Sequence, residues 1–221
     1  MNGHLSGKIQ HWNITHGKTD TNGATMRTAV VGKPGSGKTD LTKTLSEILN
    51  IVRISSGDLV RKHGFAGSDE EKHGQLAPNE PLVRKLVKDA IGDSDMYILD
   101  GFPRTIDQVE EVDIELDVVI YLDCADFIAL NRVLDRGRPD DTAVIWEQRH
   151  HVYLEKTLPL AAYYNNKEML VTVNANQDRA EVVGQAVVEL ANKGLYIPSK
   201  YVKGLIKSYE RGQSNNRSKK R

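Results

Sequence analysis

The stretch GKPGSGKT, Gly32–Thr39, restricts the possible fold of this chain more than any other feature. It fits the pattern G-x-x-x-x-G-K-[S/T] and stands between the β-branched run at residues 28–32 and a segment with helical leucine spacing at residues 38–49. Glycines in such a turn let backbone N–H groups point inward, the helix amino terminus adds partial positive charge, and the lysine reaches the outer phosphates. The motif therefore predicts a strand, a phosphate-binding loop (P-loop) and a helix that together bind a nucleoside triphosphate.

Two residues at the end of this motif bear on metal and phosphate binding. Thr39 supplies the hydroxyl expected near Mg²⁺. Asp40 is an unexpected neighbour, because a carboxylate one residue past the loop repels phosphate unless it points away or faces the metal. The residues predicted to contact ATP through the loop are Gly35, Ser36, Gly37, Lys38, Thr39 and Asp40.

The remainder of the chain continues the alternation of strands and helices. Apolar runs at residues 51–54, 96–100, 117–123 and 169–173 predict four more strands, and segments with helical spacing separate them. Alternating β and α elements predict an α/β fold in which a five-stranded, mainly parallel, doubly wound sheet has helices on both faces. This is the architecture expected of a P-loop NTPase.

Composition fits one soluble domain and excludes several other classes. The chain has 221 residues, 39% of them apolar and 27% charged, and its 30 basic and 30 acidic side chains cancel. We therefore predict no membrane and no specific nucleic-acid partner. We expect the domain to span residues 27–193, between a disordered extension at residues 1–26 and a carboxyl-terminal extension at residues 194–221 whose basic end is disordered.

Cysteine usage and the lack of targeting signals point to the cytoplasm. The single Cys124 excludes an internal disulfide framework and a multi-cysteine structural zinc site. No apolar run approaches the roughly 18 to 20 residues of a membrane span, and no signal-peptide core is present at the start. We expect a cytoplasmic monomer.

Arginines stand at the ends of several predicted elements. A phosphate dianion is already a nucleophile near neutral pH, so an enzyme that phosphorylates another phosphate needs little help from a base. It needs cations that hold the reacting groups and neutralise charge, and planar arginine suits both tasks. The candidates, in chain order, are Arg61, Arg104, Arg132, Arg136, Arg138 and Arg149.

Five motifs in order give the chain a family resemblance. They are SSGDLVR (residues 55–61), GQLAP (74–78), LDGFPRTIDQ (99–108), RVLDRGRPDD (132–141) and LPLAAYY (158–164). Across residues 27–193 the chain resembles adenylate kinases, most of all the short form with a minimal lid. The resemblance implies reversible phosphoryl transfer from MgATP to AMP, giving two ADP, with a nucleoside-monophosphate-binding part at residues 56–91 and a lid at residues 136–141.

The resemblance also implies roles for individual residues. Lys38 and the arginines at positions 104, 132, 136, 138 and 149 would be catalytic. Asp100 would hold Mg²⁺ through water, together with Thr39. Arg132, Arg136 and Gln177 would contact ATP, with Arg132 stacked near its base and Gln177 meeting the adenine mainly through its backbone. The AMP site would comprise Ser56, Arg61, Gln75, Leu76, Ala77, Gly101, Phe102, Pro103, Arg104, Gln108, Arg138 and Arg149.

Gln108 bears on the choice of acceptor. Its amide combines a donor and an acceptor, which matches adenine, whereas the related pyrimidine kinases tend to have Asn at this position and at that of Thr105. A UMP/CMP kinase is thus one alternative, and Gln108 argues against it. A nucleotide sensor or slow ATPase with weakened kinase activity is another.

Two departures from the family pattern support that second alternative. Asp40 replaces a usual Thr or Ser, which affects the expected contact with the α-phosphate. Only Gly137 separates Arg136 from Arg138, so almost no lid remains. Because lid closure normally excludes water, we predict lower fidelity against ATP hydrolysis.

Overall fold

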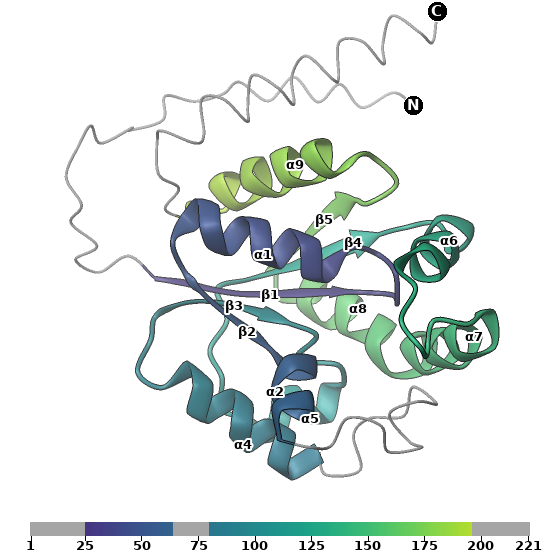
Figure 1. Cartoon of the computed structure of the whole chain (residues 1–221). Coiled ribbons are helices and arrows are strands. Elements are labelled where there is room, and N and C mark those ends of the chain that lie inside the picture. Colours follow the sequence, from purple (N-terminus) through teal and green to yellow (C-terminus); the bar gives the residue numbers. More distant parts are fainter. Residues whose placement is uncertain (1–24, 64–79, 196–221) are drawn as a thin grey trace, which may run out of the picture.

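The computed structural model describes residues 25–63 and 80–195 (Figure 1). Most of the two predicted extensions lies outside this range. Three of the predicted AMP-site residues, Gln75, Leu76 and Ala77, also lie outside the described residues.

The centre of the molecule is a five-stranded sheet in which all neighbouring strands are parallel. Its strands are β1 (Met26–Gly32), β2 (Val52–Ser55), β3 (Met96–Asp100), β4 (Val118–Asp123) and β5 (Leu170–Asn174), in the order β2-β3-β1-β4-β5. The chain winds from the central β1 toward both edges, and in such sheets ligands bind at the carboxyl ends of the strands where the order reverses. The predicted doubly wound α/β fold is confirmed.

Helices cover both faces of this sheet (Figure 1). In chain order they are α1 (Lys38–Leu49), α2 (Ser56–Lys62), α4 (Glu80–Ile91), α5 (Ile106–Glu111), α6 (Asp126–Arg136), α7 (Ala143–Val152), a π-helical turn (Tyr153–Thr157), α8 (Leu158–Asn166) and α9 (Arg179–Asn192). Helices α1 and α9 pack on one face, and α4 and α8 pack on the other. None of the helices within the described ranges is both long enough and apolar enough to cross a bilayer.

Strand β1 shows why these strands read as continuous apolar runs. Val30 packs in the core beneath α1 and α9, whereas Ala29 and Val31 pack in the core on the opposite face. Because both faces are covered, both sets of alternating side chains are buried. The sheet is thereby fixed on two sides and holds its carboxyl edge rigid.

Element boundaries differ slightly from those predicted. Strand β1 begins at Met26, two residues before the predicted start and inside the segment assigned to the extension. Met26 is fully buried, and its backbone N–H donates to the Asp95 carbonyl at 2.8 Å. The prediction followed the β-branched run alone, and pairing with β3 carries the strand beyond it.

Candidate active site

The site lies at the carboxyl edge of the sheet, where three strand ends meet. In the register, Ser55 at the end of β2 faces Asp100 at the end of β3, and Asp100 in turn faces Val30 of β1. Strand β1 runs on for two further residues and passes into the phosphate loop at Gly32. The loop and the acid predicted to serve it are therefore neighbours because of strand register.

Glycines shape the phosphate loop. Gly35 has φ +84°, and a Cβ there would lie 2.1 Å from the Ala129 carbonyl oxygen of α6, so no other residue fits. Gly37, with φ +93°, precedes the first turn of α1 and has open space around it. The Ser36 hydroxyl is buried and, within the described residues, has no hydrogen-bond partner. The loop thus presents the start of α1 as an anion site.

Lys38 lies across this loop. Its Nζ donates to the carbonyl oxygens of Gly32 at 2.7 Å and Lys33 at 2.8 Å. Desolvation lowers the pKa of Lys38 to about 8; Asp100 opposes this shift, while the positive charges of Arg104 and Arg136 add to it. These interactions place one lysine, one carboxylate and two arginines around the same loop.

Thr39 and Asp100 fit the expected magnesium site. The Thr39 hydroxyl donates to Asp100 Oδ2 at 2.9 Å, and Asp100 is only 5% exposed. Hydroxyl and carboxylate oxygens are ligands that Mg²⁺ accepts, and this ion usually keeps several waters and binds few protein groups. The described residues contain no cluster of three or more His, Cys, Asp or Glu suited to a metal. The two residues fit a metal that arrives with the nucleotide.

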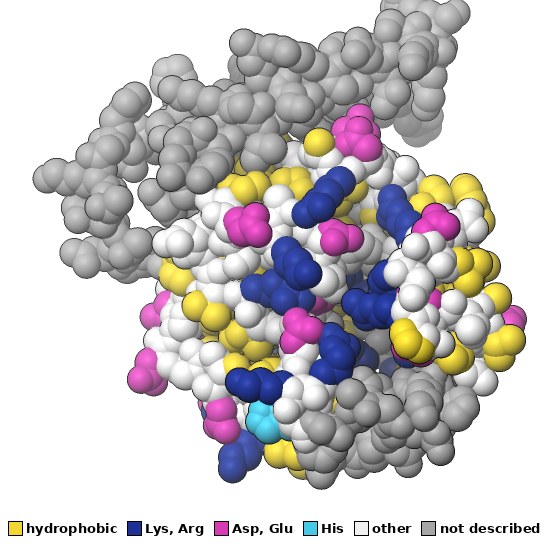
Figure 2. Space-filling model, in the orientation of Figure 1, with side chains coloured by type: hydrophobic (Ala, Val, Ile, Leu, Met, Phe, Trp, Pro, Cys, Tyr) yellow, Lys and Arg dark blue, Asp and Glu magenta, His cyan; other side chains and the backbone are white. Residues whose placement is uncertain are grey.

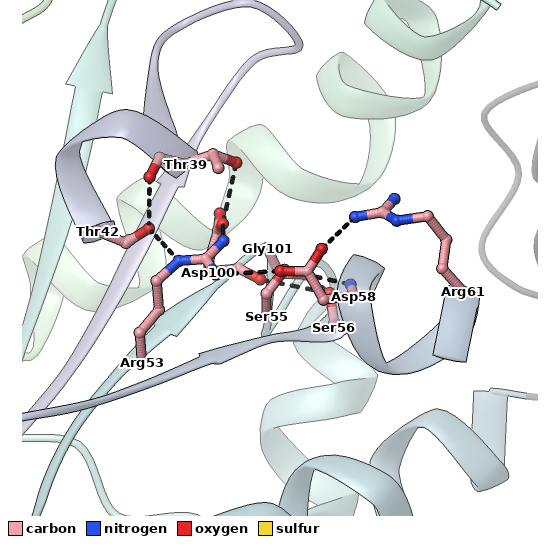
Figure 3. A network of polar contacts seen from close by, with 9 residues as sticks. All are labelled: Thr39, Thr42, Arg53, Ser55, Ser56, Asp58, Arg61, Asp100 and Gly101. Atoms are coloured by element: carbon pink, nitrogen blue, oxygen red, sulfur yellow. Dashed lines mark hydrogen bonds and ion pairs between the residues drawn. The ribbon is translucent and has the colours of Figure 1, made fainter. Parts of the chain in front are cut away.

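Asp100 also belongs to a network that sequence analysis did not predict (Figure 3). Arg53, in β2, contacts Asp100 through Nη2 at 2.5 Å and Asp58 through Nη1 at 3.0 Å. Asp58, in the first turn of α2, contacts Arg61 at 2.5 Å. The network runs from the phosphate loop to the predicted AMP site.

The turn after β3 places Arg104 and Gln108. Gly101 has φ +75°, and a Cβ there would lie 3.2 Å from both Arg104 Nη2 and Ser56 Oγ. Phe102 and Pro103 are buried, and Arg104 Nε donates to the Gly101 carbonyl at 2.8 Å. The Gln108 side chain is buried, and its Oε1 accepts from the Arg104 backbone N–H at 2.6 Å. The turn therefore fixes the orientation of the Gln108 amide.

Ser56 connects this turn to α2. The buried Ser56 hydroxyl donates to the Gly101 carbonyl at 2.8 Å. Ser55 caps the same helix by accepting from the Asp58 backbone N–H at 3.3 Å. The predicted AMP residues Ser56, Gly101 and Arg104 are thus brought together, and Arg61 follows one turn along α2.

The segment between α6 and α7, predicted as a minimal lid, is a turn built around Asp141. The Asp141 side chain is buried and accepts from Arg136 Nε at 2.8 Å, from Arg136 Nη2 at 2.5 Å and from the Arg138 backbone N–H at 3.0 Å. Hydrogen bonds from Arg136 hold the pKa of Asp141 below its ordinary value. Gly137, with φ +70°, ends α6 and lets the chain turn. The side chain of Arg138 is exposed.

Helix α7 carries Arg149 and contacts the phosphate loop. Arg149 Nη2 contacts Asp140 at 2.5 Å. One turn earlier, Trp146 donates from its indole nitrogen to the Pro34 carbonyl at 3.0 Å. Arg149 is therefore held at a fixed position relative to the phosphate loop.

Arg132 and Gln177 meet at the other end of the site. Arg132 Nη1 donates to the Ala175 carbonyl at 2.8 Å, and its Nη2 donates to the Gln177 carbonyl at 3.3 Å. Arg132, which is predicted to stack near the ATP base, thus holds the loop after β5. The backbone of this loop at Gln177 is predicted to contact the adenine.

Asp40 is exposed in the first turn of α1. Its charge is one of those that raise the pKa of Arg136, after the larger effect of Asp141. The carboxylate therefore acts on the same arginine that is predicted to contact ATP.

Basic and acidic side chains alternate around the site. Figure 2 shows Lys and Arg side chains gathered over the middle of one face, with acidic side chains among them. Arg61, Arg136 and Arg149 each contact an aspartate. These aspartates occupy positions on the guanidinium groups that phosphate oxygens can also use.

Arg53, Asp58, Asp140, Asp141 and Trp146 are the residues that the sequence analysis gave no role. Arg53 carried a signal, since an arginine between apolar residues of a short strand needs a polar partner when its side chain is covered. Asp140 and Asp141 stood in the quoted motif RPDD without an assigned function. Trp146 lies in a helical segment and carried no specific signal.

The parallel sheet and the phosphate loop before α1 together define a P-loop NTPase fold, and charged side chains surround the loop. The family model for adenylate kinase matches residues 30–169. Adenylate kinase 1 of Nostoc sp. is 33% identical over 183 residues, covering 75% of this chain and 99% of that protein. The adenylate kinase of Mycolicibacterium smegmatis is 37% identical over 182 residues, covering 75% and 99%. That of Encephalitozoon cuniculi is 34% identical over 157 residues, covering 67% and 88%. The chain belongs to the adenylate kinase family, and the predicted resemblance is confirmed.

Proposed function

We propose that this protein transfers the terminal phosphoryl group of ATP to AMP, reversibly, and forms two ADP. The observation that carries the proposal is the geometry of the phosphate loop, in which Lys38 Nζ contacts the carbonyl oxygens of Gly32 and Lys33 and the Thr39 hydroxyl contacts Asp100 at 2.9 Å. Membership of the adenylate kinase family supports the same reaction and does not favour a pyrimidine kinase or a nucleotide sensor.

The AMP phosphate attacks without a protein base. Its second pKa is about 6, so near neutral pH it is a dianion that needs positioning more than deprotonation. Arg61 and Arg104, beside the turn after β3, would hold this phosphate. Lys38 and Arg136 would hold the phosphates of ATP, while Arg138 and Arg149 would neutralise charge on the group in transfer.

Thr39 and Asp100 would hold Mg²⁺, Asp100 through water. When bound, the ion would neutralise charge on the ATP phosphates and orient them for in-line transfer. The pairing of the Thr39 hydroxyl with Asp100 at 2.9 Å supports this assignment, because the two oxygens are already adjacent.

Aspartates hold the arginines in position before the nucleotides bind. Arg136 and Arg149 are oriented by Asp141 and Asp140, so their side-chain entropy is reduced in advance. The hydrogen bond of Arg132 to the Gln177 carbonyl would likewise shape the ATP base site. Such preorganisation favours the reaction because fewer groups must be ordered in the transition state.

Gln108 would select adenine in the acceptor site. Its buried amide is oriented by the Arg104 backbone N–H, and this supports a role in reading one base. The remaining AMP-site residues, including those outside the described ranges, stay as predicted from the resemblance. The single cysteine supports a reducing compartment, and we propose a cytoplasmic monomer.

The test measures ADP formation from MgATP with AMP, CMP, UMP or no acceptor. We expect turnover restricted to AMP in the unaltered protein. Gln108→Asn should lower kcat/KM for AMP by about tenfold to a hundredfold, equivalent to about 1–3 kcal/mol, and narrow the preference over CMP and UMP. Gln148→Asn, at an exposed position on α7, is the matched control. Turnover with none of the monophosphates would contradict the assignment as a kinase.

A further inference from the structure

Arg53 occupies a position between two functional regions of the site (Figure 3). It lies in the edge strand β2, and its side chain is 15% exposed. Each of its three guanidinium nitrogens has a different partner: Nε donates to Thr42 Oγ1 at 3.0 Å, Nη1 to Asp58 Oδ2 at 3.0 Å, and Nη2 to Asp100 Oδ2 at 2.5 Å. A group held on three sides is built into the site and is no solvated surface charge.

Both carboxylates that Arg53 contacts are shared with groups of the proposed machinery. Asp100 Oδ2 accepts from Arg53 and also from the Thr39 hydroxyl, on the side of the phosphate loop. Asp58 uses Oδ2 for Arg53 and Oδ1 for Arg61, on the side of the AMP site. Arg53 thus links the region of the phosphate donor to the region of the acceptor.

Thr42 determines how Arg53 can move. Its hydroxyl is fully buried on α1 and holds Nε, the inner nitrogen of the guanidinium. With Nε held by Thr42, Arg53 could lose one of its two aspartate partners and stay in place through the other. The Asp58 side chain is 55% exposed; partial desolvation opposes its ionisation, but hydrogen bonds from Arg61 and Arg53 outweigh this effect and lower the pKa of Asp58 to about 2.

We propose that Arg53 is a positioning residue that couples the two nucleotide sites, so that binding of MgATP tightens the binding of AMP. The inference rests on the proposed function. Asp100 would hold Mg²⁺ through water and already uses Oδ2 for both Thr39 and Arg53, so with MgATP bound it would hold Arg53 less strongly. Arg53 keeps Thr42 and shifts its charge toward Asp58. Asp58 then holds Arg61 less strongly, and Arg61 becomes available to the AMP phosphate.

The experiment is a calorimetric titration of AMP into the full chain, alone and with saturating Mg²⁺ and the β,γ-imido analogue of ATP. In the unaltered protein we expect the analogue to lower the Kd for AMP by about fivefold or more, the lower end of typical coupling between sites. In Arg53→Gln we expect the analogue to change the Kd for AMP by less than about twofold, because the two nucleotide sites are then no longer linked through Asp58.

Arg27→Gln is the matched control. Arg27 is also a partly buried strand arginine with a carboxylate partner, Asp117 at 2.7 Å, but it lies at the opposite end of β1. It should leave the ratio of the two AMP affinities unchanged. Arg53→Lys retains a charge beside Asp100 but cannot span three partners, so it should fold normally and still lose the coupling.

A double-mutant cycle identifies the connection. If Arg53 acts through Asp58, Asp58→Asn combined with Arg53→Gln should lose no more coupling than either variant alone. The inference fails if the analogue does not tighten AMP binding in the unaltered protein, or if Arg53→Gln and Arg53→Lys retain the full ratio. Absence of ADP formation by the unaltered protein would instead overturn the proposed function, so the two failures are distinguishable.

Discussion

Among single residues, Lys38 has the most strongly constrained charge in the site. It caps two carbonyl groups of the loop, and desolvation together with the neighbouring arginines lowers its pKa to about 8. A lysine in solution titrates near 10.4, so the folded protein gives up this proton at lower pH. The charge that receives the phosphates is therefore present at neutral pH and lost at mildly alkaline pH.

The affinity of the nucleotide-free protein for ATP should consequently depend on pH. Below about pH 8 Lys38 is an ammonium, and above it the group becomes neutral, so ATP affinity should fall by up to about tenfold per pH unit. Calorimetry from about pH 6 to about pH 10 measures this. In Lys38→Arg, whose charge does not titrate there, the fall should disappear. An affinity that stays constant to about pH 10 would contradict the role.

Asp40 gives a second prediction at this scale. Asp40→Thr removes a negative charge from the first turn of α1, beside the loop, and should lower the KM for ATP by about threefold to tenfold, with kcat little changed. The same change should reduce the free energy of unfolding by about 0.3–1 kcal/mol, because a negative side chain in the first turn interacts favourably with the helix dipole. Steady-state kinetics and urea unfolding measure the two effects. Asp40→Asn, which keeps the shape, should behave similarly; an unchanged KM in both variants would mean that the carboxylate faces away from the phosphates.

Among elements, the junction of α6 and α7 brings together several of the arginines predicted to be catalytic. Two ion pairs form here: Arg136, at the end of α6, pairs with Asp141, and Arg149, in α7, pairs with Asp140. The buried Asp141 also accepts the backbone N–H of Arg138, so one side chain fixes both the turn and an arginine. In this protein the turn itself positions these side chains.

Asp141→Asn should loosen this junction. Loss of the charged hydrogen bonds should reduce the free energy of unfolding by about 1–2 kcal/mol, a value reduced because Arg136 is partly exposed to solvent. The kcat should fall by about tenfold or more, since Arg136 and Arg138 lose their common anchor. Urea unfolding and the ADP-forming assay provide the measurements. As a control, Asp135→Asn changes an exposed acid of α6 that has no such role; an equal loss of activity in that variant would contradict the importance of the junction.

For the whole molecule, the connection between α6 and α7 that is predicted to act as the lid is short. Only the turn from Gly137 to Thr142 separates the two helices. Closed sites exclude water from the reaction, so a nearly lidless enzyme should discriminate less well between AMP and water.

We therefore expect slow hydrolysis of MgATP in the absence of AMP. A coupled assay for ADP and free phosphate detects it, and Lys38→Met, which lacks the phosphate-binding charge, shows whether a contaminant is responsible. Hydrolysis should drop in that variant in parallel with kinase activity. If the unaltered protein hydrolyses MgATP no faster than Lys38→Met does, the prediction is wrong.

Local sequence was sufficient for the fold class and the phosphate loop, whereas the roles of the arginines stay predictions. The loop is contiguous in sequence, and its glycines, lysine and threonine act through backbone geometry that neighbours in the chain impose. The strands are covered on both faces, so their apolar runs were readable without knowledge of their partners. Boundaries shifted where pairing extended a strand, as at Met26.

Only the tertiary structure decided which charges meet. Arg53 was visible as an arginine within a strand, but its contact with Asp100 depends on the parallel register of β2 and β3, which joins residues 47 positions apart. Likewise, Trp146 reaches the Pro34 carbonyl only because α7 packs beside the loop. Sequence determines the chemistry that each side chain can offer. Partner choice depends on register and packing across the whole fold, because an ion pair or hydrogen bond requires atoms within a few ångströms.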